Sequence, residues 1–128
     1  TNVDFVISTL ISELRAVGAL DNILIVLYSD FGRTPKINRS NGRDHWPVGG
    51  ALMIGGGIDG GRAVSGTDDD LRAFESIDAT TGLANTGGIQ LNPTHLGGAV
   101  LALTLGENYL QYRPYLTAVP ALTRLKSG

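Results

Sequence analysis

The sequence contains no cysteine, no run of basic residues and no long apolar run, and each absence excludes a class of protein or site. Without cysteine there are no disulfides, thiol nucleophiles or thiolate metal ligands, although such a chain is compatible with reducing and oxidising compartments alike. The 10 lysines and arginines, against 12 aspartates and glutamates, form no basic run that could neutralise a row of nucleic-acid phosphates. No apolar run approaches the about 18 residues of a membrane-spanning helix. We therefore expect no nucleic-acid partner and no membrane span.

The N-terminus also lacks an initiator methionine and a signal peptide. Because the chain begins at Thr1 inside a helical pattern, we expect it to be cut from something longer. With 128 residues, of which 42% are hydrophobic, the chain is long and apolar enough to bury one core. We interpret residues 1–128 as a single partial α/β domain.

The first half of the sequence combines one helical pattern with two short apolar runs. Apolar residues recur at helical spacing up to Val17, and Gly18 is expected to end this helix. The run from Ile23 to Leu27 predicts a strand buried on both faces of a parallel sheet. Residues 48–57 predict a second strand that ends in glycines. A helix leading into such a strand is one unit of an α/β fold.

The second half of the sequence predicts a long loop followed by a helix. Residues 60–91 are rich in glycine, threonine, aspartate and serine, which indicates a loop. Asn92 is expected to be the N-cap of the helix, Pro93 its first residue and Gly106 its terminator. The prolines in residues 107–128 predict short turns rather than a further helix.

The polar segment "SDFGRTPKINRSNGRDHWP", residues 29–47, is the candidate functional site. Ligands of open α/β sheets collect beyond the carboxyl ends of the strands, and Asp30 directly follows the first strand. The Asp30 carboxylate and the His45 imidazole would suit a divalent metal such as Zn²⁺ or Mn²⁺. Arg33 and Arg43 carry donor forks that would hold a tetrahedral oxyanion. The alternative is that Asp30 is a turn residue or helix cap and that His45 packs against its neighbour.

Three further polar features are weaker candidates. Asp44 precedes His45 and is a candidate to orient the imidazole as a hydrogen-bond acceptor. His95 falls in the first turn of the second helix, where we expect a structural role. The glycine-rich stretch 55–61 lacks the Gly-Lys-Ser/Thr of a phosphate-binding loop, so we expect a strand-to-loop turn there.

The segments "SDFGRTPKIN", "GRDHWP" and "MIGGGIDGG" closely resemble the C-terminal portion of the domain-of-unknown-function family fifteen hundred and one. This uncharacterised bacterial family belongs to the alkaline-phosphatase and sulfatase-like superfamily. The resemblance implies a parallel-sheet sandwich that is incomplete in this chain, with Asp30 and His45 as metal ligands. It also implies a periplasmic or extracellular location. Phe31 stands where the superfamily usually has a second ligand, histidine or asparagine.

The resemblance implies one of two functions. The first is a metal-dependent hydrolase of phosphate or sulfate esters, in which Zn, Mn, Mg or Ca is bound and Arg33 or Arg43 holds the anion. Its hydroxyl nucleophile and acidic ligands belong to the N-terminal half, so we expect the chain alone to be inactive. The alternative is a non-catalytic secreted structural or assembly subunit. In either case the missing half, or a partner chain in a larger assembly, is expected to cover an apolar edge or face of the sheet.

Overall fold

The computed structural model describes residues 2–68, 74–111, 113 and 116–125 as a mixed α/β chain. Its elements in chain order are α1 (Val3–Ala16), η1 (Leu20–Asn22), β1 (Leu24–Tyr28), β2 (Gly32–Arg33), β3 (His45–Trp46), β4 (Ala51–Gly55), α2 (Pro93–Leu105), η2 (Gly106–Gln111) and η3 (Pro120–Leu122), where η denotes a 3₁₀ helix. Within the described ranges no helix is long and apolar enough to cross a membrane.

The strands form two antiparallel pairs. β1 pairs with β4, with Leu24 opposite Gly55 and Tyr28 opposite Ala51. β2 pairs with β3 in a small hairpin that connects the two longer strands. The predicted parallel sheet is therefore wrong for the strands of the described residues. A parallel pair needs a crossover connection, usually a helix, whereas this chain turns back through a hairpin.

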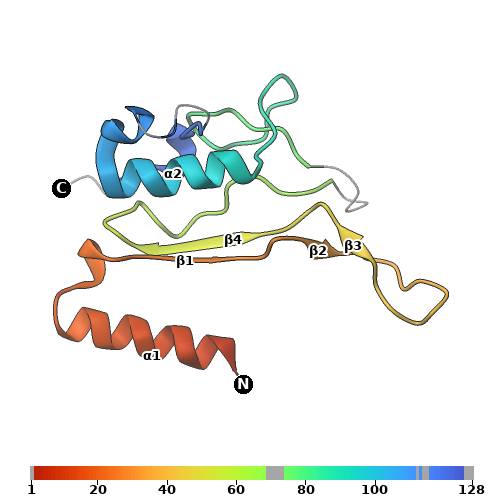
Figure 1. Cartoon of the computed structure of the whole chain (residues 1–128), viewed down its shortest axis with the longest axis horizontal. Coiled ribbons are helices and arrows are strands. Elements are labelled where there is room, and N and C mark those ends of the chain that lie inside the picture. Colours follow the sequence, from red (N-terminus) through yellow and green to blue (C-terminus); the bar gives the residue numbers. More distant parts are fainter. Residues whose placement is uncertain (1, 69–73, 112, 114–115, 126–128) are drawn as a thin grey trace.

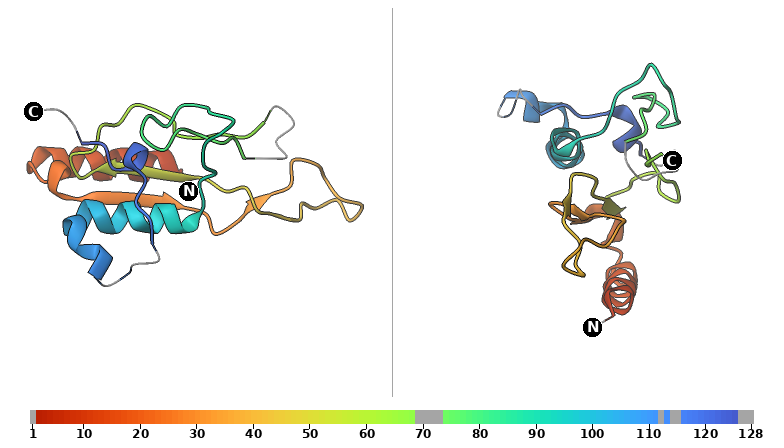
Figure 2. Two further views of the ribbon diagram at one scale, coloured as in Figure 1. Left: turned by 90° about the horizontal axis from the view of Figure 1, so that it is seen from above. Right: turned by 90° about the vertical axis from the view of Figure 1, so that its right-hand side faces the viewer.

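The two helices lie on opposite sides of the β1–β4 pair (Figures 1 and 2). α1 ends before Gly18, as predicted, and this glycine has the left-handed φ of +67° that favours glycine after a helix. None of the residues of α1 is buried, and β1 is partly exposed along its length. The predicted burial of the first strand on both faces is thus wrong for the described part of the chain, where β1 pairs only with β4 and no residue of the facing helix α1 is buried.

The bounds of α2 agree with the prediction. The Asn92 side chain accepts hydrogen bonds from the backbone N–H groups of Thr94 and His95, at 2.9 and 3.3 Å. His95 Nδ1 accepts the Asn92 N–H at 3.2 Å, which completes a capping box with Pro93 at the first helical position. Gly106 is the C-cap. The structural role that we expected for His95 is confirmed.

The buried core lies on the α2 side of the sheet. Figures 1 and 2 show the long loop and the C-terminal segment around α2, on the side of the β1–β4 pair opposite α1. The buried apolar residues are Ile77, Ala99, Tyr109, Val119 and Ala121. Within the predicted loop, isolated antiparallel bridges join Ile77 to Ala84 and Ile89. This loop is held by a few backbone pairs rather than by extended strands.

Candidate functional site

The predicted site lies on the β2–β3 hairpin, which extends beyond the end of the β1–β4 pair (Figure 1). At its base the Ser29 N–H donates to the Gly50 carbonyl at 3.2 Å. Further out, the Thr34 N–H donates to the Asp44 carbonyl at 3.0 Å. Gly32 allows the two arms to approach, since a Cβ at this position would collide with the carbonyl oxygen of Val48. The hairpin therefore brings the residues after β1 against those before β4.

One face of the hairpin gathers three side chains of the predicted segment. The Phe31 and His45 rings stack, with centroids 3.8 Å apart and planes inclined by 24°. The Arg33 guanidinium carbon lies 5.0 Å from the centroid of the Phe31 ring. Arg33 is opposite His45 in the β2–β3 register, and residues two apart on a strand share a face, so Phe31 is a diagonal neighbour of His45.

Asp30 is connected to this cluster through Phe31. Its Oδ1 accepts the backbone N–H of Phe31 at 3.0 Å, and its side chain is exposed. His45 is exposed as well, and neither of its ring nitrogens makes a hydrogen bond within the described part of the chain. The structure therefore brings the segment that holds Asp30 against His45 and leaves the imidazole nitrogens available to a ligand.

The two predicted ligands fit part of a metal site. A carboxylate and an imidazole are donors that suit Zn²⁺ or Mn²⁺, but a catalytic zinc has about three protein ligands. Over the residues that the structure describes, no group of three or more histidine, aspartate or glutamate side chains is close enough to hold a metal ion. Metal binding by Asp30 and His45 stays a prediction, and it requires at least one donor from elsewhere.

Both predicted anion-binding arginines donate hydrogen bonds from one arm of the hairpin to backbone carbonyls of the other arm. Arg33 donates from one terminal nitrogen to the carbonyl of Arg43 at 3.1 Å. Arg43 donates from one terminal nitrogen to the carbonyls of Thr34 and Pro35, at 2.9 and 2.7 Å. A guanidinium has five N–H donors, so these bonds leave others on each side chain for an anion. Anion binding by Arg33 and Arg43 stays a prediction, while their hydrogen bonds between the arms were not foreseen from the sequence.

Comparison with known proteins identifies the family. The family described as "Protein of unknown function (DUF1501)" matches residues 1–83, which include both strand pairs and the hairpin with its predicted site. The chain belongs to the DUF1501 family. No curated protein and no solved structure matches it. The sequence resemblance is confirmed at the level of this family.

In this DUF1501 chain Asp44 has a different role from the one considered. Its carboxylate accepts a hydrogen bond from the Asn38 amide at 2.8 Å. The Asn38 side-chain oxygen in turn accepts the N–H groups of Ser40 and Gly42, each at 3.0 Å. Among the described residues Asp44 makes no hydrogen bond to His45, so the idea that it orients the imidazole is wrong. Neighbouring residues of an extended segment point to opposite faces, which separates these two side chains.

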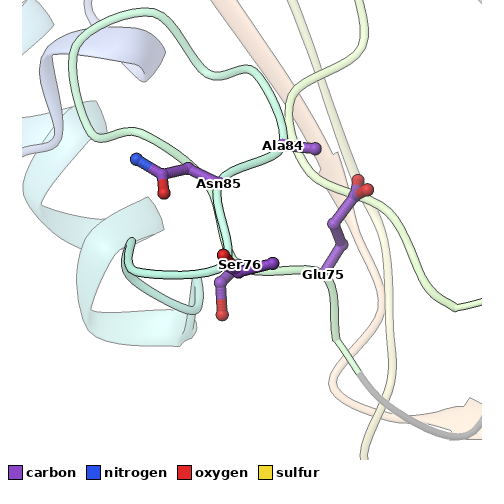
Figure 3. Close-up of a pocket in the computed structure, with 5 residues that line it drawn as sticks. Glu75, Ser76, Ala84 and Asn85 are labelled. Carbon is purple, nitrogen blue, oxygen red and sulfur yellow. The ribbon is translucent and has the colours of Figure 1, made fainter.

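The DUF1501 chain also has a cavity of about 380 Å³ in the long loop, outside the hairpin. It is lined by Glu75, Ser76, Ala84, Asn85 and Thr86. Figure 3 shows the lining side chains, of which Glu75 alone is ionisable. None of the predicted site residues contributes to this cavity, so the hairpin remains the candidate site.

Proposed function

We propose that this chain is the C-terminal part of a metal-dependent hydrolase of phosphate or sulfate esters. The observation that carries the proposal is the contact between Phe31 and His45, with ring centroids 3.8 Å apart. Asp30 immediately precedes Phe31, so the two predicted ligands come from adjoining parts of one hairpin. The helices on opposite sides of the β1–β4 pair support an alkaline-phosphatase and sulfatase-like sandwich (Figure 2). Its further strands would come from the N-terminal half of the domain.

In this proposal the residues of the chain hold and orient the ester. A bound divalent ion, Zn, Mn, Mg or Ca, would supply Lewis-acid polarisation of the ester oxygen. Asp30 would bind the ion through its carboxylate and His45 through a ring nitrogen. Arg33 and Arg43 would bind the anionic oxygens of the ester with the donors that the hairpin does not use. The nucleophilic hydroxyl and the acidic ligands would come from the N-terminal half, in a periplasmic or extracellular protein.

The proposal is tested in a longer DUF1501 protein that contains this sequence. His45→Gln removes one ligand and should lower metal affinity by more than about 100-fold. This exceeds the loss of affinity that follows when a residue that only contacts a ligand is removed. Hydrolysis of an aryl phosphate or aryl sulfate should fall with it. His95→Gln is the matched control, because glutamine at this position preserves a capping box. Bound metal is measured by mass spectrometry of the purified proteins, and turnover by release of the aryl alcohol.

The isolated 128-residue chain is the third arm of this experiment. It should not hydrolyse either ester, because it holds two predicted ligands and no positioned nucleophile. A longer protein that is folded, metal-free and inactive toward both esters would contradict the hydrolase proposal.

A non-catalytic secreted structural or assembly subunit is the second candidate function. The exposed apolar side chains of α1 favour it, since Val3 is 61% exposed and Phe5 is 67% exposed. β1 and β4 also each have one edge without a partner strand among the described residues. Apolar faces and open edges of this kind are typical of surfaces that another chain covers. A folded, metal-free protein found in a stable complex would support this candidate.

A further inference from the structure

We infer that Phe31 is the positioning residue of His45, and that its ring sets the plane of the imidazole while the ring nitrogens stay available to a ligand. Nothing in the family match assigns a role to this residue. The inference deepens the proposed function and rests on it for the identity of the ligand, a divalent cation. The contact between the two rings, however, can be measured without any metal.

The geometry of the contact suits positioning rather than ligand binding. The rings meet face to face, with centroids 3.8 Å apart and planes 24° apart, so rotation of the imidazole about its Cβ–Cγ bond would drive it into the Phe31 ring. A metal ion binds an imidazole nitrogen through a lone pair in the ring plane. Contact on the face of the ring therefore restricts the ligand without competing for the atom that binds the metal.

Phe31 makes several contacts within the hairpin besides its contact with His45. Its backbone N–H donates to Asp30 Oδ1 at 3.0 Å, and its carbonyl accepts the Ser29 hydroxyl at 2.5 Å. The Arg33 guanidinium lies over its ring, 5.0 Å from the centroid. Phe31 is half-buried, whereas His45 is exposed and makes no hydrogen bond through its ring within the described residues. Among the described residues, the stack is thus the ring contact that restrains the imidazole, which makes no hydrogen bond there.

The same residue also connects the two predicted ligands. The Asp30 carboxylate holds the backbone of Phe31, and the Phe31 ring holds the imidazole of His45. Outer-sphere contacts of this kind orient metal ligands and reduce the conformational freedom that metal binding must remove. A substitution that removes the ring should therefore weaken metal binding although Phe31 itself is not a ligand.

The first measurement is the NMR spectrum of the full chain with labelled histidines. His45 and His95 are its two histidines, and in the described residues His95 stacks on no aromatic ring. Ring current from Phe31 should shift the His45 ring protons upfield, and Phe31→Leu should abolish this shift while Phe31→Tyr keeps it. The His95 signals report the fold through the capping box. Phe5→Leu, at an exposed position of α1, is the matched control and should change neither histidine.

The second measurement is a titration with zinc chloride of the longer DUF1501 protein and its Phe31 variants, followed at the His45 resonances, because the proposed metal centre needs a donor from outside the described residues. Phe31→Leu should weaken zinc binding by about three- to tenfold, the factor that corresponds to the loss of one aromatic pair. Phe31→Tyr should bind zinc as the unmodified protein does. This rescue by a second aromatic ring separates positioning from a general requirement for an apolar side chain.

The outcomes distinguish the inference from the proposed function. The inference would be overturned if the His45 ring protons had the same chemical shifts in Phe31→Leu as in the unmodified chain, with the His95 signals unchanged. Equal zinc affinity of the unmodified longer protein and its Phe31→Leu variant would overturn it as well. A Phe31-dependent ring shift without any response of His45 to zinc would support the positioning of the imidazole and contradict the proposed metal centre.

Discussion

At the scale of single residues, local hydrogen bonds determine the shape of the long loop. Asp78 Oδ1 accepts the N–H of Thr81 at 2.7 Å, the Thr81 hydroxyl at 3.0 Å and the N–H of Thr80 at 3.0 Å. The backbone bond from Thr81 contributes most to lowering the pKa of Asp78 below its ordinary value of 3.8, followed by the Thr81 hydroxyl and the Thr80 N–H. All three bonds favour the charged carboxylate.

Thr81→Val should raise the pKa of Asp78 toward its ordinary value, because it removes one of the three donors. A carboxylate with a depressed folded-state pKa stabilises the fold at pH values above its unfolded pKa of about 3.9, and this stabilisation is lost as the pH falls through the folded pKa. Thr81→Val should reduce that acid-dependent loss. Carboxyl NMR titration and urea unfolding at several pH values measure both effects.

Thr80→Val is the control for this substitution, since Thr80 contacts Asp78 through its backbone N–H, which valine retains. An Asp78 pKa that is the same in Thr81→Val and in the unmodified chain would contradict the role of the hydroxyl.

Part of the candidate site could be predicted from residue type and position in the sequence. Asp30 and His45 were identified because a carboxylate and an imidazole are metal donors that flank predicted strands. The stack of Phe31 on His45 was missed, since it depends on the register of two strands of two residues each. Such short strands show no hydrophobic alternation in the sequence, so the face shared by their side chains was not predictable.

At the scale of elements, the helices were more predictable than the strand pairing. Capping depends on residues adjacent in sequence, so Asn92 and Gly106 marked the ends of α2 correctly. Strand direction depends on a partner that is distant in sequence. The apolar run of β1 reads the same in a parallel and an antiparallel pair, and the hairpin between β1 and β4 decided the direction.

The adjacent glycines of α2 should respond oppositely to alanine. A Cβ at Gly98 would stand 2.5 Å from the Thr117 carbonyl carbon, so Gly98→Ala must push the C-terminal segment off the helix. We expect a destabilisation of about 1–3 kcal/mol, as for overpacking of a core. At Gly97 the nearest atoms are 3.7 Å away on the Leu116 side chain, so Gly97→Ala should be neutral or stabilise by up to about 1 kcal/mol.

Urea unfolding of the two alanine variants measures this difference. Gly97→Ala serves as the control, because it has the same change in helix propensity and lies one position away. Equal stability of the two variants would show that the C-terminal segment does not cross α2 at Gly98.

At the scale of the whole molecule, the chain covers one side of its sheet better than the other. The buried residues lie in the long loop, α2 and the C-terminal segment, whereas α1 contributes none (Figure 2). The apolar stripe of α1 correctly predicted a helix, but its burial depends on a covering surface that the described residues do not provide. The sequence prediction named an apolar edge or face of the sheet, whereas these exposed apolar side chains lie on α1.

This exposure predicts that the isolated chain associates. Val6 and Leu10 lie one helical turn apart on α1, with exposed fractions of 53% and 42%, and the net charge of −2 provides little repulsion. Light scattering should give a mass above 13.4 kDa that rises with concentration. Val6→Glu combined with Leu10→Glu should reduce the association. Leu83→Glu, at a 71% exposed leucine of the long loop, should not. A monodisperse monomer of the unmodified chain, folded by circular dichroism, would show that α1 requires no covering surface.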